Sequence, residues 1–596
     1  MQPRWQVVFL TVVVTAVLMA GPGPVLAKDG GARVDKAKDA PQHVLRITLR
    51  GQVFEAQPPL QLFGSVAGAG LTDLTDAIHK AAKDPKVSSL VIRFHGAAMG
   101  WTQRQTLRRA LLSFRKSGKP SRCFLTAAGG SDYALASACS EVSLHPTGMI
   151  EIPGLSMDLM YLKGLLDKVG VRFQELRMGR YKSAVEPMTR KEPSEPVVEQ
   201  MNSLLDALYE EFCDAIAENR GMKQVEVRGI VDAALYNAKE AKAAGLVDRI
   251  EFEDEFLARV AGPAKQKLVE AKFGKGMELQ SGGFAGMMQM FGQIFGGPKK
   301  TVESKKPKIA VIYGTGAIME SGSGGLFGGE AMTSRQLVPL FRKVRNDPTV
   351  KAVVFRVNSP GGSALASDLI AREVQLTAAK KPVVISMGDV AASGGYYVSC
   401  RASWIVAERG TITGSIGVIG AVPDMKRMYA KLGLTYTRFS RGKRAGMVTP
   451  TGELTPDGRK LLMKFMHEVY DDFLTHVAEG RKLTMEAVAS IAEGRVWTGA
   501  QALRLGLVDE VGGMDAAMAK ARLLGDVPAD VEIMTLPKAK TFFDMLNELS
   551  GEGATLRSLV ASLPPEIRRQ LRKVEWIGCL ARERVLCVWP EVVEIR

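Results

Sequence analysis

One serine of this chain stands in a setting typical of a nucleophile. Ser393 lies in the segment D-V-A-A-S-G-G-Y-Y, directly after the strand-like run V-V-I-S-M at Val383–Met387. A helix is expected to begin at Ser393, so that Gly394 offers a backbone N–H beside the hydroxyl. Serine and glycine are also the residues that helix caps and tight turns require. Taken alone, the segment therefore fits a structural turn as well as a catalytic site.

A second glycine-rich turn lies one β-α unit upstream. N-S-P-G-G-S, Asn358–Ser363, follows a strand-like run directly and precedes a predicted helix. Backbone N–H groups at such a turn point outward and can hold an anion or a developing oxyanion. The two turns together predict a serine nucleophile with a two-donor oxyanion hole.

The chain is an internal duplication. Y-E-E-F-C-D-A-I-A-E-N-R from Tyr209 recurs as Y-D-D-F-L-T-H-V-A-E-G-R from Tyr470, an offset of 261. Upstream, D-P-K-V-S-S-L-V-I-R-F from Asp84 matches D-P-T-V-K-A-V-V-F-R-V from Asp347 at offset 263. The period is far too long for a solenoid, so the repeat is a whole duplicated domain.

The first copy serves as an internal control for the two motifs. At offset 263, Ser393 corresponds to Gly130, and N-S-P-G-G corresponds to H-G-A-A-M. A purely structural motif would be expected in both copies. Only the second copy is therefore predicted to carry the nucleophile.

No histidine lies near Ser393, so another residue has to accept its proton. A buried lysine is suited to this because burial favours the neutral amine. The first copy places Lys182 in a loop, within R-M-G-R-Y-K-S-A-V-E-P. Offset 263 puts Ala445 opposite it in the second copy, whereas offset 261 puts Lys443 there. Spacing alone does not separate a catalytic Lys182 from a solvated loop lysine.

Composition and the N-terminus predict an exported protein that meets membranes. The 596 residues carry a formal net charge of +16, without zinc-finger spacing or an aromatic-studded basic strand. A membrane surface therefore matches this charge better than a nucleic acid, and no nucleic-acid partner is predicted. Residues 1–27 combine one arginine, an apolar run and V-L-A, the pattern of a signal peptide. An uncleaved anchor is the alternative.

Nothing in the sequence predicts a metal site or a cofactor. The six histidines are dispersed, and neither H-E-x-x-H nor C-x-x-C occurs. Most of the six cysteines are expected to be small buried hydrophobic residues, while Cys579 and Cys587 leave a disulfide open.

Apolar strand-like runs alternate with amphipathic stretches in each copy, which predicts β-α-β units and buried parallel sheet. In the second copy, helices are expected at Ser334–Asn346 and Ala364–Ala379. The predicted organisation is a signal or anchor at 1–27, a first α/β domain at 44–261, a Gly/Met/Phe/Lys-rich linker at 262–307, a second α/β domain at 308–537 and a helical tail at 538–596. The apolar centre of the linker, 282–297, is either flexible or a membrane-surface contact.

Four motifs in this order resemble the signal peptide peptidase A family in its long, duplicated bacterial form. They are G-R-Y-K-S-A-V-E-P, R-V-N-S-P-G-G-S, G-D-V-A-A-S-G-G-Y-Y and T-G-S-I-G-V-I-G. The resemblance covers nearly the whole chain after the signal, but not the 282–297 segment or the tail. It implies two tandem spiral domains of β-β-α units, as in the Clp-protease/crotonase superfamily. It also implies a serine endopeptidase that degrades signal peptides and other short or unfolded membrane-associated peptides.

The resemblance assigns roles to individual residues. It implies a Ser/Lys dyad with Ser393 as nucleophile and Lys182 as general base. Ser415 would hydrogen-bond the lysine, and Gly361 and the backbone of Gly394 would form the oxyanion hole. The serine and the lysine would come from different copies, within one chain or across a subunit contact. The resemblance further implies a homotetramer at the periplasmic face of the inner membrane.

Two other functions compete with this hypothesis. One is a non-catalytic peptide-binding scaffold in membrane protein quality control, against which the intact site residues argue. The other is an acyl-CoA enzyme on the same fold, against which the export signal argues. The glycine-rich segment 314–329 lacks the G-K-[ST] of a phosphate loop, and we expect it to form a mobile edge of the substrate groove.

Overall fold

The computed structural model describes residues 42–56, 68–271, 273, 304–322, 331–537 and, as one short strand, 586–588. The predicted signal or anchor, the 282–297 segment, Cys579 and most of the tail lie outside these residues. By its contacts, the chain from Gln42 onward is one unit. No helix within the described ranges is long and apolar enough to cross a membrane.

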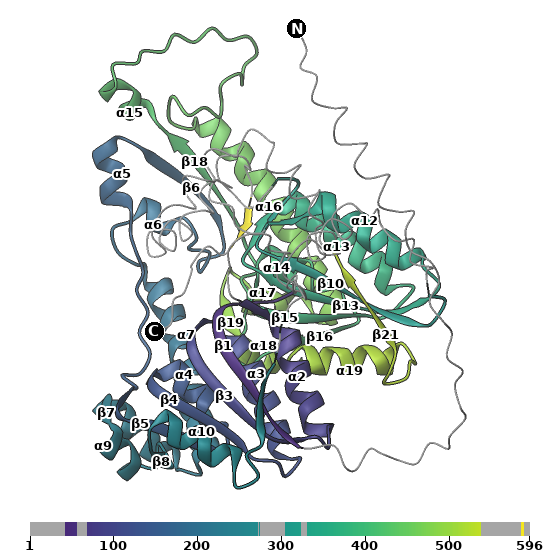
Figure 1. Ribbon diagram of the computed structural model, residues 1–596. Helices are drawn as coiled ribbons and strands as arrows, with labels where there is room; N and C mark the ends of the chain where they lie inside the picture. Colours follow the sequence, from purple (N-terminus) through teal and green to yellow (C-terminus); the bar gives the residue numbers. More distant parts are fainter. Residues whose placement is uncertain are drawn as a thin grey trace, which may run out of the picture. The chain divides into compact units, whose positions relative to one another are not determined.

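The first copy is an α/β unit with a mostly parallel sheet, drawn in purple and blue in Figure 1. Its strands are β1 (His43–Phe54), β2 (Gly68–Gly70), β3 (Val87–Ala98), β4 (Ser121–Gly129), β5 (Glu141–Glu151), β7 (Leu235–Asn237), β8 (Arg249–Ile250) and β9 (Lys267–Glu270). Its helices are α2 (Leu71–Lys83), α3 (Trp101–Arg115), α4 (Gly130–Ala136), α5 (Lys163–Val169), α6 (Glu186–Thr189), α7 (Glu195–Arg220), α8 (Gln224–Ala233), α9 (Ala238–Ala243) and α10 (Glu253–Ala261). The sheet order is β2-β1-β3-β4-β5-β7, with β9 beside β1 and β8 beside β5.

The second copy repeats this plan. Its strands are β10 (Lys308–Thr315), β13 (Val350–Ser359), β15 (Val383–Ala392), β16 (Trp404–Ala407), β17 (Ile412–Gly414), β19 (Val496–Thr498), β20 (Glu510–Val511) and β21 (Glu532–Leu536). Its helices are α12 (Ser334–Asn346), α13 (Ala364–Ala378), α14 (Gly394–Tyr397), α15 (Lys426–Lys431), α16 (Pro456–Arg481), α17 (Met485–Ile491), α18 (Gly499–Arg504) and α19 (Met514–Leu524). The sheet order is β19-β17-β15-β13-β10-β21, with β16 beside β15 and β20 beside β16. The central strands β10, β13 and β15 are buried along most of their length, which explains their continuous apolar sequences.

Matching side-chain contacts in the two copies explain part of the sequence repeat. In the first copy the Tyr133 hydroxyl donates to the carbonyl of Leu246 at 2.8 Å, and Arg220 pairs with Asp248. The second copy repeats both contacts, with Tyr396 donating to Leu507 at 2.9 Å and Arg481 pairing with Asp509. The repeated G-L-V-D motif therefore anchors a helix to the sheet, and this is a structural role in both copies.

A third sheet joins the two copies. It contains β12 (Ala331–Thr333), β11 (Ala317–Met319), β14 (Gly361–Ser363), β22 (Leu586–Val588), β18 (Val418–Asp424) and β6 (Arg172–Met178), in that order. Strand β6 comes from the first copy and pairs antiparallel with β18 of the second, from Met178 opposite Val418 to Arg172 opposite Asp424. Leu176 and Met178 of β6 are buried in the hydrophobic core of the second copy. The first copy thus contributes a strand to the core of the second.

Buried polar contacts also hold the copies together. Asp389 accepts hydrogen bonds from the backbone N–H and the hydroxyl of Thr102, at 2.7 and 2.8 Å. Burial raises the pKa of this carboxyl. Arg356, almost fully buried, pairs with Glu55 at 2.8 Å. Because an unpaired buried charge is costly, these contacts favour one arrangement of the copies.

Most elements predicted for the second copy are confirmed, and three predictions need correction or restriction. The predicted linker contains β9, which pairs with β1 as β21 pairs with β10. The tail, predicted as helical, contributes strand β22, which pairs with strands distant in sequence. This strand is only three residues long, which is too short for the local sequence pattern to indicate it. Part of the 314–329 segment is the ordered strand β11, while 323–330 lie outside the described residues.

Candidate active site

Three side chains named from the sequence meet in one buried cluster. The Lys182 Nζ lies 2.6 Å from the Ser393 Oγ and 2.8 Å from the Ser415 Oγ. It also donates to the backbone carbonyl of Ser415 at 2.9 Å. All three residues are at most 1% exposed. Lysine and serine come from different copies of the same chain.

Ser393 is held in a conformation that serine rarely adopts. It links β15 to α14 with φ of 54° and ψ of −114°. Its N–H donates to the carbonyl of Gly414 at 2.8 Å, and its carbonyl accepts from the N–H of Tyr397 at 2.8 Å. A positive φ at a non-glycine residue stores strain and persists only where the surroundings impose it. The turn therefore aims the hydroxyl toward the lysine instead of relaxing into a regular helix cap.

Lys182 is positioned by backbone packing rather than by its own loop. It follows β6, and the preceding Tyr181 donates its N–H to the carbonyl of Glu493 at 2.9 Å. Gly494, which follows Glu493 in the chain, has a φ of 78° and donates its N–H to the carbonyl of Ile416 at 2.7 Å. A Cβ added at Gly494 would lie 2.6 Å from the Cβ of Lys182. The lysine backbone is thus pressed against a glycine that leaves no room for a side chain.

Ser415 presents two oxygens to the lysine through a second strained backbone. Its φ is 52°, and its N–H donates to the carbonyl of Arg495 at 2.7 Å. It follows β17, which pairs with β15 so that Gly414 lies opposite Ala392. The register of these two strands therefore places Ser415 beside Ser393.

The N-S-P-G-G turn is tied down by its own side chains. The Asn358 Oδ1 accepts the N–H of Val390 at 3.1 Å, which fixes the turn to β15. The N–H of Gly361 donates to the buried Ser359 hydroxyl at 3.1 Å. A Cβ at Gly395 would lie 2.6 Å from the carbonyl oxygen of Ser359, so the second glycine of S-G-G permits this close packing. Sequence reasoning missed Ser359, although its place two residues before Gly361 could have indicated the contact.

The acidic residue of K-S-A-V-E-P supports the lysine loop. Glu186 is buried and accepts hydrogen bonds from Arg177 at 2.9 Å and from the hydroxyl of Ser194 at 2.7 Å. These contacts join the end of β6 to the start of α7. The motif around Lys182 thus has a structural part beside its reactive one.

The competing lysine lies elsewhere. Lys443 and Ala445, the residues that the two offsets align with Lys182, are exposed in the loop after α15. Gly130, at the repeat position of Ser393, begins α4 in the first copy. The first copy therefore contributes the lysine and no serine at this position.

Within the described ranges, no group of three or more His, Cys, Asp or Glu side chains is placed to hold a metal ion. Four cysteines are free and buried, as expected for small hydrophobic residues: Cys123, Cys139, Cys213 and Cys400. The side chain of Cys587 is not among the described groups, so its pairing with Cys579 stays a prediction.

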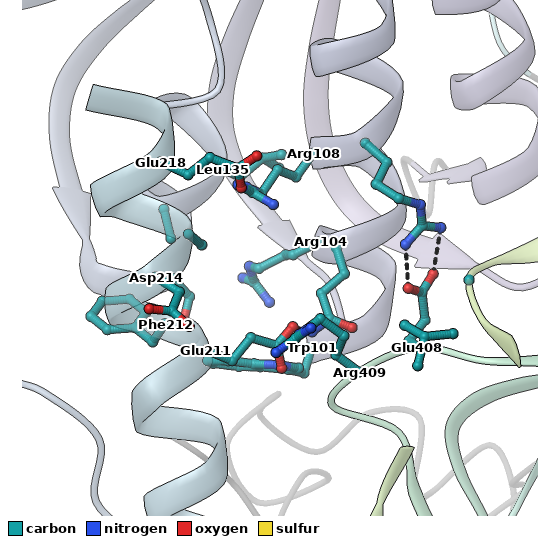
Figure 2. Close-up of a pocket in the computed structure, with 17 residues that line it drawn as sticks. Trp101, Arg104, Arg108, Leu135, Glu211, Phe212, Asp214, Glu218, Glu408 and Arg409 are labelled. Atoms are coloured by element: carbon teal, nitrogen blue, oxygen red, sulfur yellow. Dashed lines mark hydrogen bonds and ion pairs between the residues drawn. The ribbon is translucent and has the colours of Figure 1, made fainter. Parts of the chain in front are cut away.

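A cavity of about 320 Å³ lies between the first and the second copy and is separate from the Lys182–Ser393–Ser415 cluster (Figure 2). It is lined by α3, α4 and α7 of the first copy and by Glu408, Arg409, Val511 and Gly512 of the second, and neither Ser393 nor Lys182 contributes to its wall. Ala134 in this wall corresponds to Tyr397 in the second copy, where the ring packs 4.8 Å from Phe473 and its hydroxyl donates to Asp368. The cavity thus borders a position at which the second copy has a tyrosine instead of an alanine.

Glu211 is a carboxylate in the wall of this cavity. It accepts hydrogen bonds from Gln105 and, at 3.5 Å, from the indole N–H of Trp101. Burial raises its pKa to about 7. Figure 2 shows it beside Trp101, facing the arginines of α3.

This chain is similar to several known proteins. The model of Peptidase family S49 matches it twice, at residues 113–267 and 375–528, once in each copy. The chloroplastic serine protease SPPA of Arabidopsis thaliana is 33% identical over 514 residues, 86% of this chain and 74% of that protein. Protease 4 of Haemophilus influenzae is 33% identical over 477 residues, 77% of this chain and 74% of that protein. Among solved structures, a mutant of the 1510-N membrane-bound stomatin-specific protease has a TM-score of 0.25 and 18% identity, covering 39% of this chain and 98% of that one.

The contact at Gly494 yields a first prediction. Gly494→Ala would push the backbone of Lys182 away from Ser393, and misplacing a catalytic group by about 1 Å costs about 100-fold in rate. We expect kcat for a peptide reporter to fall between tenfold and 100-fold with the circular dichroism spectrum retained. Gly433→Ala is the matched control, because Gly433 has a similar φ of 72° and open space around it. Equal losses in both variants would attribute the effect to backbone strain alone.

Glu211 yields a second prediction. The pKa of the Glu211 carboxyl is higher in the folded chain than in the unfolded chain. As pH rises, the unfolded chain therefore loses this proton at a lower pH than the folded chain does. The resulting loss of stability develops between about pH 4.5 and 7 and is complete above pH 7. Glu211→Gln should therefore increase the free energy of unfolding at pH 8 by about 3 kcal/mol, seen as a higher melting temperature, and leave it nearly unchanged at pH 4.5. Glu218→Gln, on the exposed rim of the same cavity, should give no such pH-dependent gain. A pH-independent effect of Glu211→Gln would contradict the burial argument.

Proposed function

The chain belongs to Peptidase family S49, and on that premise we propose that it is an endopeptidase with a Ser393/Lys182 dyad. The predicted family resemblance is confirmed, as are the two tandem α/β domains and the serine protease class. The family match does not name the reacting residues. The dyad, its substrates and its location are therefore our proposals.

One observation carries the proposed mechanism. The Lys182 Nζ and the Ser393 Oγ are 2.6 Å apart in a cluster that water does not reach. This is hydrogen-bond distance for proton transfer to a general base. Removal from water disfavours the ammonium form of a lysine, which is the form that cannot accept a proton.

The two oxygens of Ser415 orient the amine. A carbonyl oxygen only accepts, so the contact with the Ser415 carbonyl uses one N–H of Lys182. The Ser415 hydroxyl takes a second N–H at 2.8 Å. In the neutral amine, the lone pair then remains for the proton of Ser393. In this proposal Ser415 is a positioning residue, because its contacts hold the Lys182 amine so that the lone pair faces the hydroxyl of Ser393.

The reaction follows from this arrangement. Ser393 would attack a peptide carbonyl while Lys182 takes its proton, and Lys182 would then give that proton to the leaving amine. A water molecule, deprotonated by the amine of Lys182, would then release the acyl group from Ser393. The N–H groups of Gly361 and Gly394 would stabilise the oxyanion. Since the Gly361 N–H donates to Ser359, that hydroxyl would have to give up the bond as the oxyanion forms.

The burial of the dyad supports a restricted substrate class. Ser393 and Ser415 are fully buried, so a folded protein surface cannot reach the hydroxyl. An extended segment can be inserted, which favours cleaved signal peptides and other short or unfolded peptides. An Enterococcus faecium relative, 34% identical over 212 residues, is named a putative signal peptide peptidase SppA.

An exposed loop supports the proposed membrane association. Residues 426–446, comprising α15 and the long loop after it in Figure 1, contain seven lysines and arginines and no acidic residue. Leu432, Leu434, Tyr436 and Phe439 are exposed in the same segment, Phe439 to 89%. Apolar side chains among basic ones suit the headgroup region of an anionic bilayer. We propose that this surface meets the periplasmic face of the inner membrane.

The homotetramer stays a prediction, which sedimentation analysis can test.

The dyad is tested by removing each partner. Ser393→Ala and Lys182→Met should each lower hydrolysis of an unfolded fluorogenic peptide by about 10⁴-fold, because each removes a group needed for proton transfer. Methionine keeps the volume of the lysine stem. Ser393 should react with a fluorophosphonate probe in the wild type and not in Ser393→Ala.

Lys443→Gln is the matched control for the base and should retain full activity. Near-normal turnover by Lys182→Met, with loss of turnover by Lys443→Gln, would transfer the role to Lys443. Lack of hydrolysis and of probe labelling in the wild type would instead favour the non-catalytic peptide-binding scaffold.

The membrane surface is tested with vesicles and the chain from residue 28 onward. Arg441→Gln/Lys443→Gln should weaken binding to phosphatidylglycerol vesicles about 30-fold, since each of the two charges contributes about 1 kcal/mol near an anionic surface. Phe439→Ser should weaken it further, with peptide hydrolysis in solution unchanged. Equal binding of wild type and variants to anionic and to zwitterionic vesicles would exclude this loop as the contact.

A further inference from the structure

The cavity between the copies has an aromatic counterpart in the second copy. The helices that line it repeat exactly in length and position, since α3 and α13 are related by an offset of 263 and α7 and α16 by an offset of 261. These offsets align four wall residues with the surroundings of one tyrosine: Gln105 with Asp368, Ala134 with Tyr397, Phe212 with Phe473 and Ala215 with His476. The first copy therefore has two alanines where the second copy has two rings.

The second copy shows what this arrangement of helices can hold. The ring of Tyr397 lies 4.8 Å, centroid to centroid, from the rings of Phe473 and His476. Its hydroxyl donates to the Oδ1 of Asp368 at 3.1 Å. A phenol ring is thus held there by two rings of α16 and one acceptor of α13.

The first copy keeps a ring and an acceptor at the matching positions. Phe212 lines the cavity, and Trp101 lies 6.4 Å from it, centroid to centroid. Gln105 replaces the aspartate, and its Oε1 is buried without a hydrogen-bond partner among the described residues. Because the Gln105 amide N–H donates to Glu211, the oxygen is the atom left for another donor. A buried acceptor without a partner costs free energy, and a hydroxyl of a ligand would remove that cost.

A second polar atom in the same wall also lacks a partner. The Nε of Arg104 is buried and makes no hydrogen bond within the part of the chain that the structure describes. Figure 2 shows the Arg104 side chain extending from α3 toward α7. The wall therefore offers one free acceptor and one free donor, and a hydroxyl group can pair with either kind.

We propose that the cavity between the copies binds a phenol ring, in the way that the second copy holds the ring of Tyr397. The ring would pack against Phe212, beside Ala134 and Ala215, and its hydroxyl would donate to the Oε1 of Gln105. The cavity is large enough, because its volume of about 320 Å³ exceeds the roughly 150 Å³ in which an apolar cavity binds benzene.

The charges in the wall favour an uncharged ligand. Four arginines and four acidic residues line the cavity. Arg109 is paired with Glu408, and Arg108 is paired with Glu218, so much of this charge is balanced within the wall. A neutral phenol adds no unpaired charge to such a site. The same chemistry is present in a free phenol and in the tyrosine side chain of a peptide.

Fluorine NMR titration of the full chain tests the site with para-fluorophenol. At pH 8 the Glu211 carboxyl is ionised, since its pKa is about 7, and it keeps the amide N–H of Gln105 engaged. The probe should bind about tenfold more tightly than fluorobenzene, because fluorobenzene leaves the Gln105 oxygen unpaired. Equal affinities for the two compounds, or no binding of either, would overturn the proposal.

Variants of the wall locate the binding. Ala134→Tyr and Ala215→His introduce the side chains of the second copy, and each should weaken binding of para-fluorophenol about tenfold or more by occupying the cavity. The two positions lie on different helices, so one variant keeps the test decisive if the other folds poorly. Ala233→Tyr, at the exposed end of α8, is the matched control and should bind as the wild type does. Gln105→Met should abolish the preference for the phenol over fluorobenzene.

Unchanged binding in both cavity variants would place the ligand elsewhere and overturn the site. Competition identifies the source of the ring: displacement of para-fluorophenol by N-acetyltyrosinamide assigns the cavity to a tyrosine of a peptide, and failure to displace it assigns the cavity to a free phenol. The inference does not depend on the proposed function. Ser393→Ala should bind para-fluorophenol as tightly as the wild type, even though its peptide hydrolysis is lost.

Discussion

The site depends on keeping one lysine amine out of water within 2.6 Å of one serine hydroxyl. Neither residue can arrange this locally, because each comes from a different copy of the domain. The pairing of β6 with β18 and the burial of Leu176 and Met178 bring the lysine loop into the second copy. Gly494 and Gly414 then set the last few ångströms by close backbone contact. The packing that completes the hydrophobic core of the second copy therefore also positions the residues of the site.

Duplication has divided the work between two similar sheets. Both copies keep the tyrosine and the arginine–aspartate pair that anchor the helix to the sheet. The second copy alone has the serine of S-G-G and the paired glycines of N-S-P-G-G, and the first copy alone contributes the buried lysine. The first copy also has Ala134 where the second has Tyr397, and a cavity results. Contacts that anchor a helix to the sheet persist in both copies, whereas the residues of the proposed dyad each occur in only one.

The sequence was sufficient for the elements with strong local patterns. Helix Ser334–Asn346 and the buried strands of the second copy lie where the apolar periodicity places them. The meeting of Lys182, Ser393 and Ser415 follows the family resemblance, because spacing alone left Lys443 open. Strand β22 was not predicted, since its partners β14 and β18 are distant in the sequence. The contact of Ser359 with Gly361 is local, and its two-residue spacing was overlooked. The residues that need a positive φ, Ser393 and Ser415, carry no sequence mark of it.

The strained backbone at Ser393 has a consequence for how this protein can change. Its φ of 54° is a conformation that costs free energy at a non-glycine residue. At the equivalent position the first copy has Gly130, which begins its helix without a positive φ. Selection for stability alone would lead the second copy to the same relaxed turn. The two halves of the chain thus contain side by side the strained turn that presents the proposed nucleophile and a relaxed turn that has none.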